Sequence, residues 1–368
     1  MAALLLLLWQ ACPTPSQAQA TGTLEARIVN GALTSDYLTT AALLSGTSQS
    51  TATSYCTATL VGCSTLLTAA HCVCSSLYAP CQGGYSPDPG DYLVFFQHYG
   101  FVEVSGIVVN ASYDPNSLEG DLALITLSEA VEGIAPTPLA TVTPALGTRA
   151  RIAGFGRGGG SDNDYGLKRY GEVTTASCLN GSSASLCWNF ACNDLDNCDD
   201  SNTCNGDSGG PLFVTEDDGE VLAGVTSSGT NSQCLAEDHS YDTSVVYWMD
   251  WITGNAGETL GTGTCGDAAQ IGTSARVQAV SASGSLAATG NAATEELTVT
   301  EGTGELRVAV NAEDSGAENF SVYVKQGGAP SASDNDCAAT GSSQYAFCRF
   351  TDPATGSWYV NITSVAGS

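Results

Sequence analysis

The chain has 368 residues, enough for more than one domain, and a formal net charge of -28 with only 10 Lys plus Arg. So acidic a surface repels nucleic-acid phosphates and anionic membrane surfaces, and we expect neither as a partner. No apolar run reaches the roughly 20 residues that a membrane-spanning helix needs, so no membrane anchor is expected.

The first twenty residues have the pattern of a secretory signal. A leucine run from Leu4 to Leu8 is followed by a polar stretch and by Ala18-Gln19-Ala20, a small-residue sequence that a signal peptidase would cut. We therefore expect residues 1–20 to be a signal peptide and the mature chain to be secreted and extracellular.

The cysteines fit that compartment. The sequence holds 15, and removal of Cys12 with the signal leaves an even number that suits a disulfide framework. Zinc binding is the alternative, but there are only 3 histidines and no paired C-x-x-C clusters. We expect disulfides, with neither a metal nor another cofactor.

Short runs of β-branched and apolar residues follow one another from Ile28 to about Ile252, separated by clusters of Gly, Asn, Asp and Ser. Helical periodicity is almost absent, which is typical of an all-β sandwich or barrel. The segment Val246–Trp251 is expected to open a short helix. The clearest strand candidates are Thr57–Val61, Tyr92–Phe96, Val102–Val109, Leu122–Leu127 and Val221–Val225.

The composition changes after Cys265 to a stretch rich in Gly, Ser, Ala and Thr. We expect residues 266–290 to be a linker or the first strand of a further unit. Alternating apolar residues then return and predict a smaller β domain over residues 291–368. Its strand candidates are Leu297–Val299, Leu306–Val310, Phe320–Val324 and Trp358–Ile362.

A glycine-rich serine loop, Gly206-Asp207-Ser208-Gly209-Gly210-Pro211, is the strongest local signal for chemistry. The flanking glycines let the backbone turn sharply, expose the hydroxyl, and free the amides of Gly206 and Ser208 to bind a developing oxyanion. Alone, such a loop is often only a turn.

Two further motifs supply the groups that a serine nucleophile needs. A serine hydroxyl requires an adjacent base, and an imidazole base requires an acceptor that fixes its tautomer. His71 stands in Thr68-Ala69-Ala70-His71-Cys72, and Asp121 heads the apolar run Asp121-Leu122-Ala123-Leu124. The predicted triad is His71, Asp121 and Ser208.

With Arg27-Ile28-Val29-Asn30-Gly31, these motifs resemble those of the chymotrypsin and trypsin family from Ile28 to about Ile252. The resemblance implies two six-stranded antiparallel β-barrels with a short C-terminal helix, here residues 28–265. It also implies a serine endopeptidase that acts on protein or peptide substrates through an acyl-enzyme.

The Arg27-Ile28 bond looks like the activation site of a zymogen in this family, which makes residues 21–27 a short propeptide. Cleavage would create a charged amine on Ile28 that can enter a pocket and pair with the Asp207 carboxylate. In the family that pairing orders the oxyanion hole, so an activating protease is an expected partner and the precursor should be inactive.

The resemblance also implies disulfides. It pairs Cys56 with Cys72, Cys204 with Cys234, and Cys178 with Cys192, although Cys187 competes for the last position. A Cys74–Cys81 bridge is sterically easy. The pairing of Cys63, Cys74, Cys81, Cys187, Cys198 and Cys265 stays open.

In this family the residue six positions before the serine lies at the base of the primary specificity pocket, and here it is Asn202 where trypsin-type enzymes carry Asp. Ser227 and Gly229 align with an open wall. Ser240 and Asp242 align near the floor, where Asp242 could restore a preference for a cation or could be hydrogen-bonded and silent. The residue preference is left open.

The segment from about Leu297 to Thr363 resembles the bacterial pre-peptidase C-terminal domain, a β-sandwich often appended to secreted peptidases. From this resemblance we expect a bacterial source. Among the matching residues are Phe320-Ser321-Val322-Tyr323-Val324, Cys348-Arg349-Phe350 and Trp358-Tyr359-Val360. A Cys337–Cys348 bridge is expected from the spacing of the two cysteines. No site is assigned here.

Two alternatives to an active serine peptidase are weighed. An inactive homologue would use the scaffold to bind an extracellular partner, but such proteins typically lose the histidine or the serine, and both are present. A metallopeptidase has little support without an H-E-x-x-H motif. We expect a monomer.

Overall fold

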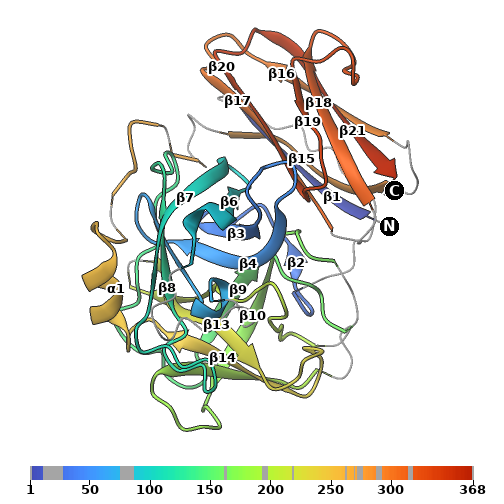
Figure 1. Cartoon of the computed structure of the whole chain (residues 1–368). Helices are drawn as coiled ribbons and strands as arrows, with labels where there is room; N and C mark the ends of the chain where they lie inside the picture. The colour runs from blue at the N-terminus through green and yellow to red at the C-terminus, as the bar shows by residue number, and fades with distance from the viewer. Residues whose placement is uncertain are drawn as a thin grey trace.

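The computed structural model describes residues 2–10, 28–74, 87–160, 164–192, 198–217, 219–261, 263–268, 270–271, 277–286, 292–313 and 318–366. Two units are visible in Figure 1, a large all-β unit and a smaller sandwich that lies against one end of it. The predicted all-β fold class is confirmed.

The first barrel is closed and antiparallel. Its six strands run in the order β3-β4-β5-β8-β7-β6. Leu43, Ala58, Leu67 and Phe96 are fully buried inside it, because alternate residues of each strand face the interior. The strands are β3 (Thr40–Ser45), β4 (Thr53–Leu60), β5 (Thr65–Thr68), β6 (Tyr92–Phe96), β7 (Gly100–Val109) and β8 (Ala123–Leu127).

The second barrel has the strand order β11-β14-β13-β12-β9-β10 and closes through pairing of β10 with β11. The two-residue strand β2 (Ala32–Leu33) adds to β10 from outside this ring. The strands are β9 (Arg149–Gly154), β10 (Arg169–Ala176), β11 (Ser185–Phe190), β12 (Pro211–Glu216), β13 (Gly219–Gly229) and β14 (Asp238–Ser244).

Helices are scarce in the described part of the chain. The α-helix α1 (Met249–Asn255) starts three residues later than the sequence predicts, and two short 3-10 turns, η1 (Ala70–Cys72) and η2 (Pro89–Asp91), complete the set. Within the described residues, no helix has the length and apolar character required to traverse a bilayer.

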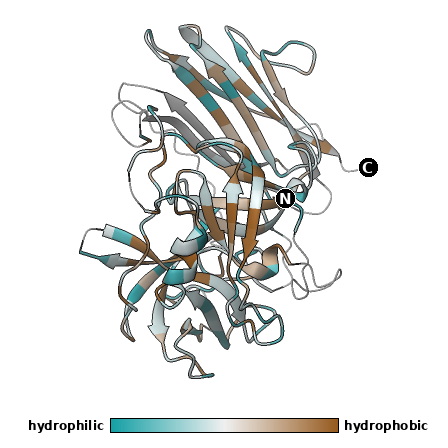
Figure 2. Cartoon of the chain, turned by 60° about the vertical axis from the view of Figure 1, so that its left-hand side comes forward, coloured by the Kyte–Doolittle hydropathy of each residue, from teal (hydrophilic) through white to brown (hydrophobic). Residues whose placement is uncertain are grey.

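The C-terminal unit is a sandwich of two four-stranded sheets, in which polar and apolar colours alternate along the strands (Figure 2). One sheet has the order β15-β1-β17-β20 and the other β16-β21-β18-β19. The strands are β1 (Ala2–Gln10), β15 (Val277–Leu286), β16 (Ala292–Val299), β17 (Glu305–Ala312), β18 (Glu318–Gln326), β19 (Cys337–Ala339), β20 (Tyr345–Thr351) and β21 (Gly356–Ala366).

Two stretches acquire structure that the sequence left uncertain. Part of the expected linker forms β15, which answers the choice between a linker and a strand. The expected signal residues form β1, which pairs with β15 and β17 in the unprocessed chain. Removal of residues 1–20 on export stays a prediction.

Six disulfides lie within the described residues. Cys56–Cys72, Cys204–Cys234 and Cys337–Cys348 join the cysteines that the sequence paired. The expected Cys178–Cys192 bridge is wrong, because Cys178 bonds Cys187 on the adjacent β11 and Cys192 bonds Cys198. Cys63 bonds Cys265, while Cys81 lies outside the described residues.

Asp242 is a fully buried acid in the wall of the second barrel. It lies opposite Thr226 on β13 and beside Gly224. Neither carboxylate oxygen makes a well-formed hydrogen bond to a described residue, although the Thr226 hydroxyl is a neighbour that favours the charged form. Burial prevails and raises the pKa of Asp242 well above its ordinary value.

This burial predicts a pH-dependent stability. Because the pKa of Asp242 is raised in the folded state, its contribution is fully present below the unfolded pKa and is lost as pH rises toward the folded pKa. The loss is about 1.4 kcal/mol per pH unit for one proton. We expect Asp242→Asn to abolish this component in urea unfolding measured from pH 4 to pH 9; parallel curves for both proteins would contradict it.

Candidate active site

His71 and Asp121 are brought together by two neighbouring strands. β5 ends at Thr68, which pairs with Ala123 at the start of β8, and the two residues project from the adjoining turns. The His71 amide donates to Asp121 Oδ1 at 2.9 Å, and His71 Nδ1 lies 2.7 Å from Asp121 Oδ2. Together the two contacts fix the imidazole ring and leave Nε2 for a reacting group.

Asp121 is fully buried and also serves the second barrel. The Ser227 hydroxyl, on β13, donates to Asp121 Oδ2 at 2.6 Å. Burial of His71 disfavours its charged form, but the charge of Asp121 and the hydrogen bond to it outweigh that effect and raise the pKa of His71. The carboxylate therefore stabilises the charged form of the His71 ring.

Ser208 lies in the turn that leads into β12. Gly209 in this turn has φ +81°, and a Cβ there would lie 2.1 Å from Thr68 Oγ1, so only glycine permits the approach to β5. The Thr57 hydroxyl donates to the Gly206 carbonyl at 2.9 Å, and the Thr57 amide donates to the Ser208 carbonyl at 2.9 Å. The turn is thus fixed against the first barrel.

His71 and Ser208 line one pocket of about 240 Å³. Its other lining residues come mainly from the loop before Ser208, the end of β13 and the start of β14. They are Thr203, Cys204, Asn205, Thr226, Ser227, Ser228, Gly229, Asn231, Ser232, Cys234 and Asp238. The predicted pocket residues Ser227 and Gly229 are among them.

Among the described residues that line this pocket, Asp238 is the one acid, and the sequence analysis did not identify it. It is 5 % exposed, and its Oδ1 accepts from the Thr230 hydroxyl at 3.0 Å and from the Asn231 amide at 2.8 Å. Both donors are neutral groups. Alternation along β14 was the available signal, since it places position 238 on the same face as 240.

Asn202 supports this acid from behind. Its amide donates to Asp238 Oδ2 at 2.8 Å and to the Cys234 carbonyl at 3.1 Å. Its Oδ1 accepts from Trp188 Nε1 at 3.1 Å and from the Ser240 hydroxyl at 2.7 Å. All its hydrogen-bonding capacity is used inside the protein, so Asn202 orients Asp238 and does not itself line the pocket.

The expectation that Ser240 and Asp242 belong to the pocket needs correction. The Ser240 hydroxyl is turned toward Asn202, and Asp242 lies further along β14 beside Gly224. Neither residue lines the pocket. Alignment with the family pointed to Asp242, whereas the acid that lines the pocket is Asp238, four positions earlier on β14.

Asp207 is fully buried beside the serine. Its Oδ1 accepts from the Gly156 amide at 2.8 Å and its Oδ2 from the Cys204 amide at 2.9 Å, yet burial raises its pKa to about 7. Ile28 is buried too, and the backbone amide of Asn202 donates to the Val29 carbonyl at 3.0 Å. No hydrogen bond joins Asp207 to Ile28 among the described residues, and Arg27 lies outside them.

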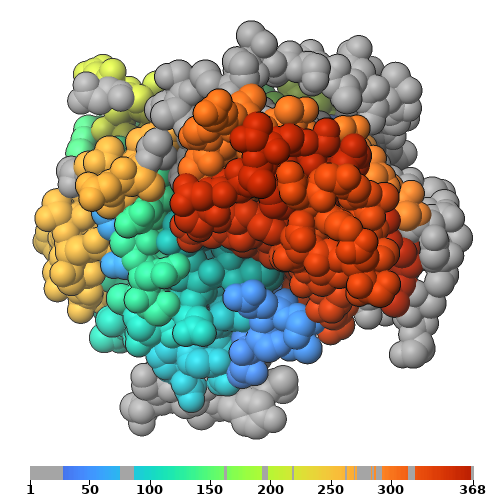
Figure 3. Space-filling view, turned by 90° about the horizontal axis from the view of Figure 1, so that it is seen from above, coloured from blue at the N-terminus to red at the C-terminus, as the bar shows by residue number. Residues whose placement is uncertain are grey.

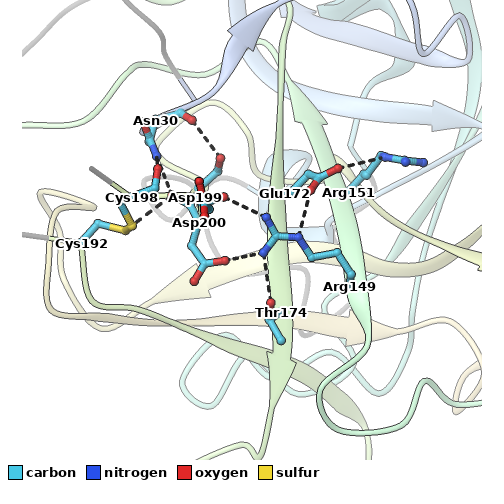
Figure 4. A network of polar contacts seen from close by, with 10 residues as sticks. Asn30, Arg149, Arg151, Glu172, Thr174, Cys192, Cys198, Asp199 and Asp200 are labelled. Carbon is cyan, nitrogen blue, oxygen red and sulfur yellow. Dashed lines mark hydrogen bonds and ion pairs between the residues drawn. A yellow bond between two sulfur atoms is a disulfide. The ribbon is translucent and has the colours of Figure 1, made fainter. Parts of the chain in front are cut away.

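The chain after Ile28 is tied to a surface network (Figure 4). Asn30 donates to the carbonyls of Cys198 at 2.7 Å and Asp200 at 2.9 Å. Arg149 NH1 lies 2.6 Å from Asp200 Oδ1 and NH2 donates to the Asp199 carbonyl. The acids at 199 and 200 therefore belong to this surface, and neither lines the pocket.

A metal does not fit the histidine site. The grouped potential ligands among the described residues are Cys56, Cys72 and His71, but both sulfurs are joined in one disulfide and His71 Nδ1 faces Asp121. Thiolates are required for such a site, so this group has no ligand set to offer.

Comparisons with known proteins agree with the geometry. The trypsin family model matches residues 28–252, and the model of the bacterial pre-peptidase C-terminal domain matches residues 296–364. Trypsin eta of Drosophila melanogaster is 26% identical over 253 residues, which cover 62% of this chain and 88% of that protein.

Two further relatives are of the same kind. Trypsin beta of Drosophila erecta is 29% identical over 202 residues, which cover 52% of this chain and 74% of that protein. Brachyurin of Leptuca pugilator is 25% identical over 211 residues, which cover 56% of this chain and 89% of that protein. The family match, the double barrel and the names of the relatives together show that this chain belongs to the trypsin family and is a serine-type peptidase.

Proposed function

We propose that the protein is a secreted serine endopeptidase in which Ser208 is the nucleophile, His71 the general base and Asp121 the residue that orients the histidine. One observation carries the proposal: the His71 ring is held by the buried Asp121 and shares a pocket with Ser208. Protein substrates follow from the family, and we further propose that the enzyme acts as a monomer.

In the proposed mechanism, His71 Nε2 takes the Ser208 proton as the Oγ attacks the substrate carbonyl. The Asp121 carboxylate stabilises the imidazolium that forms. The amides of Gly206 and Ser208 donate to the oxyanion of the tetrahedral intermediate. His71 then gives its proton to the leaving amine, and water repeats the sequence on the acyl-enzyme.

Loss of the serine tests the function directly. After activation, a fluorophosphonate should label the parent at Ser208, and Ser208→Ala should lose both labelling and peptide hydrolysis, by a factor of about 10⁶. Ser117→Ala is a matched control, since Ser117 is exposed and its hydroxyl hydrogen-bonds within its own loop, with the Asp114 carboxylate and the Glu119 amide. Equal labelling of all three proteins would favour the inactive-homologue alternative.

We propose that the chain is made as a precursor. Residues 1–20 would leave as a signal peptide, and cleavage after Arg27 would remove residues 21–27. The buried Asp207, whose pKa is raised to about 7, supports this step. Its donors among the described residues are two backbone amides, and an incoming amine on Ile28 would favour its ionised form.

Activation can be tested by changing Arg27, where cleavage releases the Ile28 amine, and by changing Asp207, the expected partner of that amine. Trypsin treatment of the purified precursor should raise hydrolysis of a peptide substrate at least about 100-fold, since an oxyanion donor is worth 10²–10³. Arg27→Gln should block the rise, and Asp207→Asn should allow cleavage without the rise. Full activity in uncleaved Arg27→Gln would contradict the proposal.

For the substrate we propose a cationic side chain, Arg or Lys, before the scissile bond. Among the described residues that line the pocket, the one acid is Asp238, which accepts hydrogen bonds from neutral donors. A guanidinium or ammonium group would supply the missing opposite charge, whereas an apolar side chain would desolvate the carboxylate without compensation.

Replacement of the pocket acid tests this preference. Asp238→Asn should lower kcat/KM for Arg and Lys substrates by about 100-fold, equivalent to about 2.7 kcal/mol, and leave Phe and Leu substrates within threefold. Asp242→Asn is the matched control, since it removes a buried acid of the same strand outside the pocket. A peptide library gives the measurement; an unchanged profile in Asp238→Asn would refute the proposal.

A further inference from the structure

The C-terminal sandwich is packed directly on the catalytic unit. Seen from above in Figure 3, its atoms lie against those of the first barrel. Tyr345 of β20 contacts the Phe95 ring at a centroid distance of 4.6 Å and the Phe155 ring at 6.1 Å. With Leu167 and Ala309 these rings form one buried apolar cluster that crosses the boundary between the units.

Polar contacts join the sandwich to the catalytic unit at several places, among them Ser54, His98 and the segment of residues 164–169, here named the bridging segment. Asn311 donates to the Gly166 carbonyl at 3.4 Å, and a Cβ on Gly166 would lie 2.5 Å from the Ala312 carbonyl oxygen. Glu313 Oε1 lies 3.6 Å from Arg169 NH2, with the two side chains 10 % and 2 % exposed. The contact is close, charged and withdrawn from water.

Arg169 connects this contact to the interior of the catalytic unit. Its NH2 also lies 3.2 Å from Asp164 Oδ2, and its NH1 donates to the Gly156 carbonyl at 3.0 Å. The same Gly156 donates its amide to Asp207. A buried guanidinium requires carboxylate partners in the interior, and one of the two comes from the other domain.

The opposite side of the bridging segment touches the oxyanion loop. A Cβ on Gly206 would lie 2.8 Å from Tyr165 Cδ1 and 2.9 Å from Gly156 Cα. The Tyr165 ring and Gly156 therefore pack against the backbone of Gly206, whose amide is one of the two proposed oxyanion donors. A shift of the bridging segment would move this backbone, because close-packed interiors transmit displacement.

We propose that the C-terminal sandwich is a positioning element of the active site. Glu313 and Tyr345 hold the bridging segment, which holds Gly206 and Asp207 in the geometry that binds the oxyanion. They act only through other residues. Since oxyanion binding belongs to the transition state, their loss should lower kcat and leave substrate affinity nearly unchanged.

The experiment uses the activated enzyme with its C-terminal sandwich retained. Glu313→Gln removes the charge without changing the shape of the side chain, and Tyr345→Leu removes the ring packing. We expect kcat to fall by about 3- to 30-fold with KM within twofold. The affinity for a peptide boronate of the substrate's sequence, whose adduct places an oxygen in the oxyanion hole, should fall by the same factor.

Controls separate positioning from stability. Asp334→Asn removes an acid that pairs with Lys325 on the exposed face of the same domain, and should leave kcat and boronate affinity unchanged. Thermal unfolding and active-site titration show whether each variant is folded and active. Unaltered kcat and boronate affinity in folded Glu313→Gln would overturn the proposal, as would a fall in activity without a fall in boronate affinity.

The inference rests on the proposed peptidase activity, and the two can fail separately. An activated parent that neither hydrolyses peptides nor binds the boronate would refute the proposed function. An active parent whose Glu313→Gln and Tyr345→Leu variants behave like Asp334→Asn would refute only the role of the sandwich.

Discussion

A single buried carboxylate, that of Asp121, constrains the arrangement of the catalytic unit. It is removed from water, so its stability depends on donors supplied by the protein. The first barrel supplies the His71 amide and ring, and the second supplies the Ser227 hydroxyl. These three contacts join the two barrels at Asp121, and in the same arrangement the turn of Ser208 lies against β5.

The other buried acids near the site also depend on the donors that surround them, but the donors differ from one acid to the next. Asp238 accepts hydrogen bonds from neutral donors and lines the pocket, which is the basis of its proposed role toward a cationic side chain. Asp207 has two amide donors, but burial dominates and raises its pKa to about 7. Asp242 has no well-formed hydrogen bond to a described residue and is a cost to stability. Environment, and not residue type, separates the roles of these acids.

The sequence was most informative where chemistry is local. The strand at Tyr92–Phe96 has the predicted bounds, and the motifs around His71, Asp121 and Ser208 meet as their residue types require. It was less informative where the outcome depends on strand register or loop path. The sequence aligned Asp242 near the pocket floor, as a cation-preferring or a silent acid, and did not identify Asp238. It joined Cys178 to Cys192, with Cys187 as a competitor. The pairing of Glu313 with Arg169 has no local signature, because it links two domains.

The Cys63–Cys265 disulfide joins positions 202 residues apart and makes most of the catalytic unit a covalent ring. A cut in a surface loop within that ring would leave the two fragments attached to each other. The bond also fixes the exit point of the chain on the first barrel, only 12 positions before β15 begins at Val277. Because the sandwich is covalently linked to the catalytic unit by a short segment, its effective concentration near the contact surface is high. A contact surface of modest intrinsic affinity is therefore enough to keep it bound.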